Sequence, residues 1–300
     1  MPVPPVLHCK SMPWVDDCLR AQSAKRKMNF TPASLTMKDL KKRLVRGETL
    51  SGCWLNLGSP VTAEIVGRAG FDWVLIDIEH GAGSAGTVLH QIQAVASTPA
   101  APIVRVESHA RQRVHRVLDL GAEGIMCPRI NTPAEAEELV RALRYPPEGV
   151  RGVATMVRAT GFGQDFTSYH RDQADNLVGI LQIETPEVLN HLDAIAALDG
   201  IDVLFIGPAD LSMALGIFGQ FDHPRFREAL RATVNAAAKA GKAAGILIFD
   251  PEDFARYHEM GMRFIACGAD ATFVANGARA TASRIDALRT DPANKPPESP

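Results

Sequence analysis

The sequence predicts an α/β fold, the (β/α)8 TIM barrel, from the number and the character of its apolar runs. Eight short apolar runs recur from residue 51 onward, and helical patterns separate them. The runs are continuous rather than alternating in polarity, which is typical of parallel strands covered on both faces. Eight β-then-α units over about 240 residues are the pattern of a closed barrel.

Each predicted strand is six or seven residues long. The eight runs are SGCWLNL (51–57), WVLIDIE (73–79), PIVRVE (102–107), GIMCPR (124–129), VGILQIE (178–184), DVLFIG (202–207), AAGILI (243–248) and RFIACG (263–268). The clearest predicted helices are PVTAEIVGRAG (60–70), ARQRVHRVLDLGAEG (110–124), TPAEAEELVRALRY (132–145) and HPRFREALRATVNAAAKAGK (223–242). Several of them begin near Pro, Ser or Thr and end at Gly, as helix capping favours.

An open, doubly wound sheet is the alternative fold. It would need a Gly-rich first turn of the G-x-G-x-x-G kind, and the corresponding stretch, LNLGSPVTAE (55–64), is not one. Residues 145–177 form a connection that is too long for an ordinary barrel loop. Long ordered loops are usually functional or interfacial, so we expect one of these two roles for it.

The composition is that of a globular protein without an evident macromolecular partner. Hydrophobic residues make up 46% of the chain and charged residues 22%. The formal net charge of −2 gives no indication of nucleic acid or an anionic membrane, and no apolar stretch approaches the length of a membrane span. The cysteines are odd in number, with spacings that fit no zinc site or disulfide framework. We expect free thiols in a reducing, cytoplasmic location. The cysteines are Cys9, Cys18, Cys53, Cys127 and Cys267.

The predicted barrel domain spans residues 38–290. Residues 1–37 are predicted to be a partly ordered N-terminal extension, and residues 291–300 a disordered tail. The first 50 residues hold ten Lys or Arg against four acids, but they lack the apolar run of a secretory signal. The acids at 16–17 argue against a transit peptide.

Two carboxylates lie at the ends of neighbouring predicted strands. Chemistry in a barrel gathers at the carboxyl ends of the strands. Glu184 and Asp210 are 26 residues apart, about one βαβ repeat, so they are expected at the same rim. Two carboxylates, with water and substrate oxygens in the remaining positions, suit Mg²⁺ or Mn²⁺. The alternative is that each acid only caps the helix that follows it.

Other polar residues are predicted at the same rim. His80 is the candidate general base, because it follows a strand end beside the two carboxylates. Asp77 either orients this imidazole or satisfies backbone donors. Arg105, inside an apolar run, needs an anion, which is either a substrate oxyanion or an internal acid. Glu79 and Arg129 also stand at strand ends.

The sequence lacks the residues that several catalytic mechanisms require. Within the apolar runs and the helices between them, the lysines are Lys239 and Lys242, at the end of a helix and just before a strand. Both are expected at the amino-terminal face, so a Schiff-base aldolase has no candidate lysine. The sequence has no G-x-S-x-G, no Cys–His pair at the rim and no P-loop.

Six motifs follow one another along the chain. They are FDWVLIDIEHG (71–81), PIVRV (102–106), YPPEGVRGV (145–153), LQIET (181–185), FIGPADLS (205–212) and GKAAGIL (241–247). In this order and spacing they resemble the metal-dependent class II pyruvate aldolases. This family includes the bacterial 4-hydroxy-2-oxo-heptanedioate and 2-keto-3-deoxy sugar-acid aldolases, and the resemblance covers roughly residues 38–288.

The resemblance implies a barrel of the phosphoenolpyruvate/pyruvate-domain type and a homo-oligomer, either a hexamer or a trimer of dimers that exchange elements. It implies that Glu184 and Asp210 bind a divalent metal, Mg²⁺, Mn²⁺ or Co²⁺. The pyruvate moiety would be contacted by Gln182, Ala209, Gly207 and Trp54.

The same resemblance assigns the catalytic steps. His80, with Asp77 nearby, would deprotonate the C4 hydroxyl through a metal-bound water, and Arg105 would stabilise the pyruvate enolate. Asp119 matches an acid that raises the basicity of the histidine. Its helix-end position predicts the wrong face of the barrel, so a neighbouring subunit would have to deliver it.

The implied activity is reversible cleavage of a 4-hydroxy-2-oxo acid to pyruvate and an aldehyde, through a metal-bound enolate. Oxaloacetate decarboxylation and CoA-thioester cleavage at the same site are the enzymatic alternatives, and a non-catalytic scaffold is the third. The sequence departs from the family pattern at Ile78 before Glu79, at Arg129, which replaces what is often a neutral residue, and in residues 156–170. The last two departures bear on the choice of aldehyde.

Overall fold

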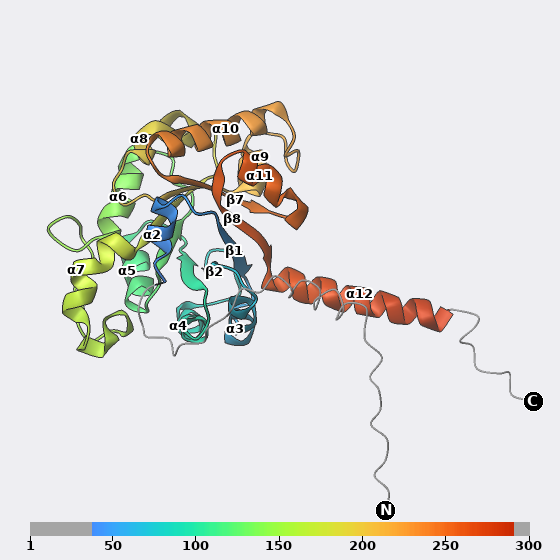
Figure 1. Cartoon of the computed structure of the whole chain (residues 1–300), viewed down its shortest axis with the longest axis horizontal. Helices are drawn as coiled ribbons and strands as arrows, with labels where there is room; N and C mark the ends of the chain where they lie inside the picture. Colours follow the sequence, from blue (N-terminus) through green and yellow to red (C-terminus); the bar gives the residue numbers. More distant parts are fainter. Residues whose placement is uncertain (1–37, 291–300) are drawn as a thin grey trace, which may run out of the picture. The chain divides into compact units, whose positions relative to one another are not determined.

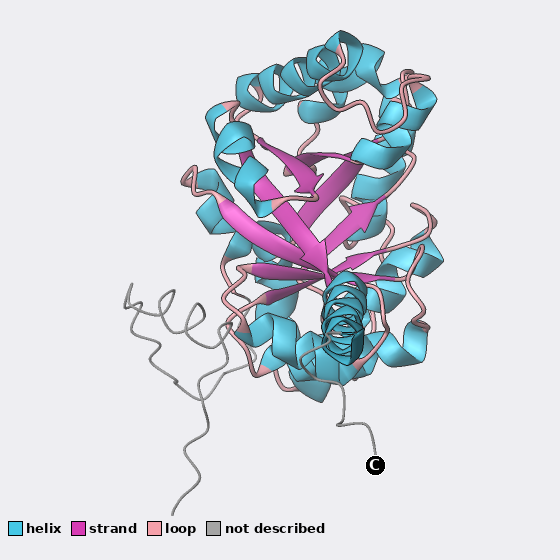
Figure 2. Ribbon diagram, turned by 90° about the vertical axis from the view of Figure 1, so that its right-hand side faces the viewer, coloured by secondary structure: helices cyan, strands magenta, loops and turns pink. Residues whose placement is uncertain are grey.

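Eight parallel strands close into a barrel in the computed structural model, which describes residues 38–290 of the chain (Figures 1 and 2). The strands follow one another around the barrel in chain order, and β8 pairs with β1 to close it. This confirms the predicted (β/α)8 fold. The predicted extension 1–37 and tail 291–300 lie outside the described residues.

Every strand begins within one residue of the apolar run that predicts it. The strands are β1 (Leu50–Leu55), β2 (Trp73–Asp77), β3 (Ala101–Arg105), β4 (Gly124–Cys127), β5 (Val178–Ile183), β6 (Val203–Ile206), β7 (Ala243–Ile248) and β8 (Met262–Ala269). Nearly all of their residues are buried, because helices cover the outside and side chains fill the inside. Continuous apolar runs are therefore the pattern that this barrel requires.

The helices between the strands begin with local capping signals. Thr132 and Glu135 form a capping box at the start of α6, and prolines stand in the first turn of α3, α6, α9 and α10. The outer helices are α3 (Pro60–Arg68), α4 (Ala85–Ala96), α5 (Arg111–Asp119), α6 (Pro133–Leu143), α8 (Leu192–Ala196), α9 (Pro208–Ala214), α10 (Pro224–Lys239) and α11 (Phe254–Glu259), with short 3-10 turns η2 (Val188–His191) and η3 (Pro251–Asp253).

The prediction of one long loop at 145–177 is wrong in its second half. That half contains the 3-10 turn η1 (Arg158–Gly163) and an eleven-residue helix, α7 (Phe166–Asn176). Gln173 is the buried residue of α7, so the helix presents no apolar stripe. Without such a stripe, the hydrophobic periodicity that identifies helices is missing from the sequence.

Aromatic side chains fill the interior of the barrel, and one short helix covers the amino ends of its strands. Trp73 stacks on Phe264 with ring centroids 4.1 Å apart, and Gly52 makes room because a Cβ there would lie 2.1 Å from the Trp73 ring. Helix α2 (Leu40–Val45) inserts Leu40 into the same apolar cluster. Lys41 of α2 pairs with Asp202, which precedes β6, so α2 covers the amino ends of the strands. Within the described residues, this leaves the carboxyl ends of the strands as the place for chemistry.

Glu123, whose carboxyl group lies at the amino-terminal face of the barrel, is expected to make the free energy of unfolding depend on pH. Burial raises the pKa of Glu123 to about 7, although its Oε2 accepts a hydrogen bond from the Lys38 backbone N–H at 2.6 Å. The unfolded chain releases this proton near pH 4.5, so the folded chain binds more protons between about pH 4.5 and 7. This carboxyl therefore lowers the free energy of unfolding as pH rises through that window.

We expect Glu123→Gln to raise the melting temperature at pH 8 and to leave it nearly unchanged at pH 4.5. Glutamine keeps the acceptor for Lys38 and removes the buried charge. Thermal unfolding followed by circular dichroism at both pH values measures the difference. Glu137→Gln, an exposed site on α6, is the matched control and should change neither value. An equal gain at both pH values for Glu123→Gln would show that ionisation is not the cause.

The last helix, α12 (Asp270–Thr290), continues from β8 and extends away from the barrel wall (Figure 1). Its first residue, Asp270, is buried and accepts hydrogen bonds from the Asn56 backbone N–H at 2.7 Å and from the Thr62 hydroxyl at 2.6 Å. These bonds tie the start of the helix to β1 and α3. Beyond residue 271 almost every side chain of α12 is exposed. No helix among the described residues is long and apolar enough to cross a membrane.

Candidate active site

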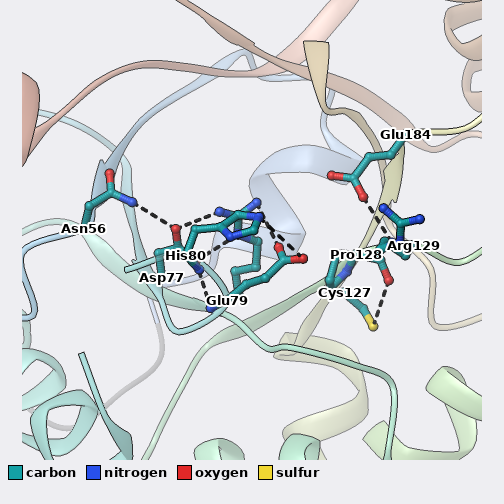
Figure 3. A network of polar contacts seen from close by, with 9 residues as sticks. Asn56, Asp77, Glu79, His80, Cys127, Pro128, Arg129 and Glu184 are labelled. Carbon is teal, nitrogen blue, oxygen red and sulfur yellow. Dashed lines mark hydrogen bonds and ion pairs between the residues drawn. The ribbon is translucent and has the colours of Figure 1, made fainter. Parts of the chain in front are cut away.

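A cluster of charged side chains lies at the carboxyl ends of β2 and β3 (Figure 3). Asp77, the last residue of β2, is fully buried and forms a two-bond pair with Arg105, the last residue of β3. Nε of Arg105 donates to Oδ1 at 2.9 Å, and Nη2 donates to Oδ2 at 2.7 Å. The two strands are in register at these residues, which explains why the side chains meet.

Arg105 also lies beside a second acid. Oε2 of Glu79 is 3.1 Å from Nη1 of Arg105, an ion pair without hydrogen-bond alignment. Burial alone would lower the pKa of Arg105, but the bonds to Asp77 and the charge of Glu79 outweigh it and keep the guanidinium charged. Burial also raises the pKa of Glu79, partly offset by the charge of Arg105. The predicted internal anion for Arg105 is therefore present, and it fixes the direction of the guanidinium.

Asp77 satisfies backbone donors and does not orient the His80 ring. Its Oδ1 accepts the backbone N–H of Glu79 at 3.1 Å and that of His80 at 3.3 Å. Its Oδ2 accepts from Nδ2 of Asn56 at 2.9 Å (Figure 3). Of the two roles predicted for Asp77, the structure shows hydrogen bonding to backbone donors. Asn56 follows β1 between Leu55 and Leu57, and no motif in the sequence singles it out.

Glu184 and Asp210 lie on neighbouring units of the same rim. Glu184, directly after β5, is 4% exposed, and its Oε2 accepts the backbone N–H of Arg129 at 3.1 Å. Burial raises the pKa of Glu184 to about 7, and the negative charge of Asp210 adds to this effect. The two carboxylates therefore repel each other in a site that favours a positive charge between them.

Neither acid caps the following helix through a side-chain hydrogen bond among the described residues, although the charge of Asp210 is favourable in the first turn of α9. Gly207 is the N-cap of α9 and Asp210 lies in its first turn, without a side-chain capping bond. In the segment after β5, the Thr185 hydroxyl accepts the backbone N–H of Val188 at 3.5 Å, whereas Glu184 accepts the N–H of Arg129, which lies beyond another strand. Gly207 lets α9 approach Glu184, because a Cβ there would lie 2.8 Å from Oε1. These two side chains are left for another role.

The donor set fits a divalent cation that takes its other ligands from elsewhere. Residues 38–290 contain no group of three or more His, Cys, Asp or Glu side chains that could hold a metal on their own. The site offers two carboxylates, and hard cations such as Mg²⁺ and Mn²⁺ accept oxygen ligands from water and substrate in addition. This is the arrangement that the sequence predicts for Glu184 and Asp210.

Gln182 and Trp54 line the interior beside these acids. Gln182, on β5, is 2% exposed, and its side-chain oxygen has no hydrogen-bond donor among the described residues. A buried amide oxygen without a partner is costly, so a bound molecule or water is expected there. Trp54, on β1, lies with its ring 5.8 Å from the Arg105 guanidinium carbon and 5.6 Å from the ring of Phe205. Trp54 therefore adjoins the charged cluster, and Gln182 is buried on the strand that Glu184 follows.

His80 and Asp119 do not meet within one chain. The His80 ring is 67% exposed, and its Nε2 is 3.8 Å from Oε1 of Glu79. Asp119 ends α5, which runs back toward the amino ends of the strands, and it pairs with the buried Arg151 at 2.9 Å. The structure thus brings together the predicted residues at the carboxyl ends and places Asp119 at the opposite face, as its helix-end position predicts.

The free thiols and the lysines lie where the sequence places them. Among the described residues, Cys53, Cys127 and Cys267 are free, and the first two are buried. Lys239 ends α10 and pairs with Asp193, and Lys242 stands before β7. Both are therefore at the amino-terminal face, away from the charged cluster.

Residues 50–277 match the family model described as HpcH/HpaI aldolase/citrate lyase. The chain belongs to the HpcH/HpaI family. The matched segment runs from β1 into α12 and includes every residue of the site. Membership confirms the resemblance and the predicted enzyme class, a carbon–carbon lyase of the aldolase type.

Relatives and solved structures agree with this assignment. The chain is 40% identical over 245 residues to the hydroxypyruvate/pyruvate aldolase of Agrobacterium fabrum, covering 81% of this chain and 92% of that protein. It is 39% identical over 250 residues to the 4-hydroxy-2-oxo-heptane-1,7-dioate aldolase of Shigella sonnei, covering 83% and 95%. An HpcH/HpaI aldolase/citrate lyase family protein from Burkholderia cenocepacia superposes with a TM-score of 0.79 at 38% identity, covering 83% and 99%.

Proposed function

We propose that this HpcH/HpaI family aldolase reversibly cleaves a 4-hydroxy-2-oxo acid to pyruvate and an aldehyde, with a divalent cation held by Glu184 and Asp210. The supporting observation is the pair of mutually repelling carboxylates beside a buried arginine whose direction is fixed. A cation of the Mg²⁺, Mn²⁺ or Co²⁺ type would supply Lewis-acid polarisation of the keto group when bound.

The charged cluster accounts for the handling of negative charge. Cleavage of the C3–C4 bond leaves an electron pair on the pyruvate fragment, as an enolate. Arg105 is charged, buried and held by Asp77 and Glu79, so it stabilises this charge without reorganising during the reaction. Gln182 and Trp54, with the backbone at Gly207 and Ala209, orient the pyruvate fragment within the barrel mouth.

His80 is the proposed base. It removes the proton of the C4 hydroxyl, and the electrons of that O–H bond form the aldehyde carbonyl as C3–C4 breaks. In the reverse direction it returns the proton to the new alkoxide. The exposed ring needs a partner to orient it, and Glu79 at 3.8 Å is the acid that this chain places nearest.

We infer that a second copy of the chain supplies the other partner. Asp119 lies at the opposite face from His80, and α12 carries exposed apolar side chains such as Phe273, Val274 and Ile285. A helix with these side chains in water is expected to pack against another subunit. We therefore propose a homo-oligomer, a hexamer or a trimer of dimers. Light scattering gives its mass, and a monomer at micromolar concentration would contradict it.

The alternatives use the same residues in other ways. Oxaloacetate decarboxylation also forms a pyruvate enolate, and thioester cleavage needs a groove for CoA. The relatives at about 40% identity are named aldolases, which favours the aldol reaction. We propose a cytoplasmic location, because Cys53 and Cys127 are free thiols.

The aldol reaction can be tested in the synthetic direction. Purified chain is incubated with pyruvate, Mn²⁺ or Mg²⁺ and a panel of aldehydes, and 4-hydroxy-2-oxo acids are identified by mass spectrometry. We expect product with at least one aldehyde and its disappearance after EDTA treatment. Product that persists in EDTA would refute the metal assignment. Oxaloacetate consumption faster than any aldol reaction would make decarboxylation the main activity.

A further inference from the structure

Arg129 stands at the rim in an unusual backbone conformation. It lies two residues beyond β4, and its φ of 54° is in the left-handed region. Arg129 is one of three non-glycine residues with positive φ among residues 38–290. Asn and Gly adopt this region at lower cost than a long side chain does. The conformation directs the Arg129 backbone N–H to Glu184, but this bond requires no arginine side chain.

The Arg129 guanidinium is free, in contrast to that of Arg105. Arg129 is exposed, and within the described part of the chain its guanidinium makes no hydrogen bond or ion pair. Arg105 is buried and is held in one direction by its ion pairs with Asp77 and Glu79. Figure 3 shows the Arg129 side chain beside Glu184, at the end of the segment that carries Cys127 and Pro128. Arg105 is therefore a fixed cation inside the barrel mouth, whereas the Arg129 guanidinium has no internal partner among the described residues and is available to a second group of the ligand.

The net charge of the site affects which acceptor aldehydes can enter it, and an unpaired arginine side chain would change this selection. Three carboxylates, Asp77, Glu79 and Glu184, interact with Arg105, and a fourth, Asp210, interacts with Glu79 and Glu184. A bound divalent cation and the carboxylate of pyruvate would still leave a net negative charge. A neutral aldehyde can enter such a site without electrostatic cost, whereas an aldehyde with its own anionic group is repelled unless a second cation attracts that group.

The position of Arg129 separates it from the pyruvate fragment. Gln182, Arg105 and Trp54 are buried inside the barrel mouth, and Arg129 lies outside them on the exposed rim. A substrate that places its 2-oxo acid end inside extends its other end toward the exposed rim, where Arg129 lies. The planar guanidinium can bind a carboxylate or a phosphate through two parallel N–H bonds.

We propose that Arg129 is a specificity-determining residue, which selects acceptor aldehydes that carry a carboxylate or phosphate group. This inference rests on the proposed aldol reaction and names its class of acceptor. Arg129 binds the anionic group of the acceptor and takes no part in forming the enolate.

The test compares matched acceptors in wild type, Arg129→Met and Arg129→Lys. Succinic semialdehyde is paired with butanal, and glyceraldehyde 3-phosphate with glyceraldehyde, so that each pair differs mainly by the anionic group. For each pair, the ratio of kcat/KM for the anionic acceptor to that for the neutral one is measured with pyruvate and Mn²⁺. Arg113→Met, an exposed arginine in the first half of α5, is the control for a general loss of positive charge.

We expect Arg129→Met to lower the ratio about ten- to hundredfold for at least one pair, and Arg129→Lys to lower it less. The pair that responds distinguishes carboxylate from phosphate. The wild-type ratio should also fall as ionic strength rises, and the dependence should weaken in Arg129→Met. Arg113→Met should leave the ratio unchanged.

Two results would overturn the inference. An unchanged ratio in Arg129→Met, in chains that still form aldol product, refutes the role of Arg129 and leaves the aldol reaction intact. Absence of aldol product with all four acceptors in wild type, together with absence of pyruvate proton exchange, refutes the aldol reaction itself and this inference with it.

Discussion

Replacing Glu184 by glutamine is expected to abolish aldol cleavage, with a loss in kcat/KM of about a thousandfold or more. Glutamine keeps the shape of the side chain and an acceptor for the Arg129 backbone N–H, but it removes one of the two charges that attract the cation. Asp210→Asn should have the same effect. Calorimetric titration with Mn²⁺ should show that both variants lose metal affinity together with activity.

The matched control for this prediction is Glu187→Gln. Glu187 is exposed and lies three residues from Glu184 in the same segment. Among residues 38–290, its side chain makes no hydrogen bond or ion pair with the charged cluster. This variant should bind Mn²⁺ and turn over as wild type does. Circular dichroism should show all variants folded. Full activity in either Glu184→Gln or Asp210→Asn would refute the assignment of that residue to the metal.

Removing the Arg105 guanidinium is expected to cause the second-largest loss, of about a hundred- to a thousandfold in kcat, with Mn²⁺ affinity reduced much less. Arg105→Lys keeps a charge but cannot make both bonds to Asp77. Arg105→Ala leaves Asp77 and Glu79 buried without their cation, which costs about 3–5 kcal/mol of stability. Arg105→Lys is therefore the variant in which to separate catalysis from folding.

Parallel measurements of kcat, Mn²⁺ affinity and melting temperature distinguish the roles of Arg105. Stabilisation of the enolate predicts that kcat falls far more than Mn²⁺ affinity. If activity and metal affinity fell by the same factor in Arg105→Lys, the guanidinium would act by arranging the metal site and not by holding negative charge.

The barrel could be predicted from the sequence because its strands are buried on both sides. Continuous apolar runs such as VGILQIE leave little ambiguity about location, and eight of them set the architecture. Helix α7 escaped prediction because it has no apolar stripe. A helix after the eighth strand follows from the repeated β-then-α pattern, but the exposure of most side chains of α12 does not. Few side chains are buried in either helix, so hydrophobic periodicity is weak in both.

The sequence predicted which site residues lie at the strand ends, but not which of their side chains contact one another. Topology alone places Glu184 and Asp210 on one rim and Asp119 on the other. The sequence left open whether Arg105 binds an internal acid, and the register of β2 with β3 decides this in favour of Asp77. The role of Asn56 depends on the same three-dimensional contact. Such pairings join residues from separate units, so local patterns do not reveal them.

We expect the rim to form a pyruvate enolate with the help of a divalent cation. The most direct measurement is proton exchange at the pyruvate methyl group in D₂O, followed by NMR, with Mn²⁺ or Mg²⁺ and then with EDTA. It requires no knowledge of the acceptor aldehyde. We expect exchange that depends on the chain and the metal and that EDTA abolishes. Absence of exchange with every divalent metal, in a folded chain, would contradict this expectation.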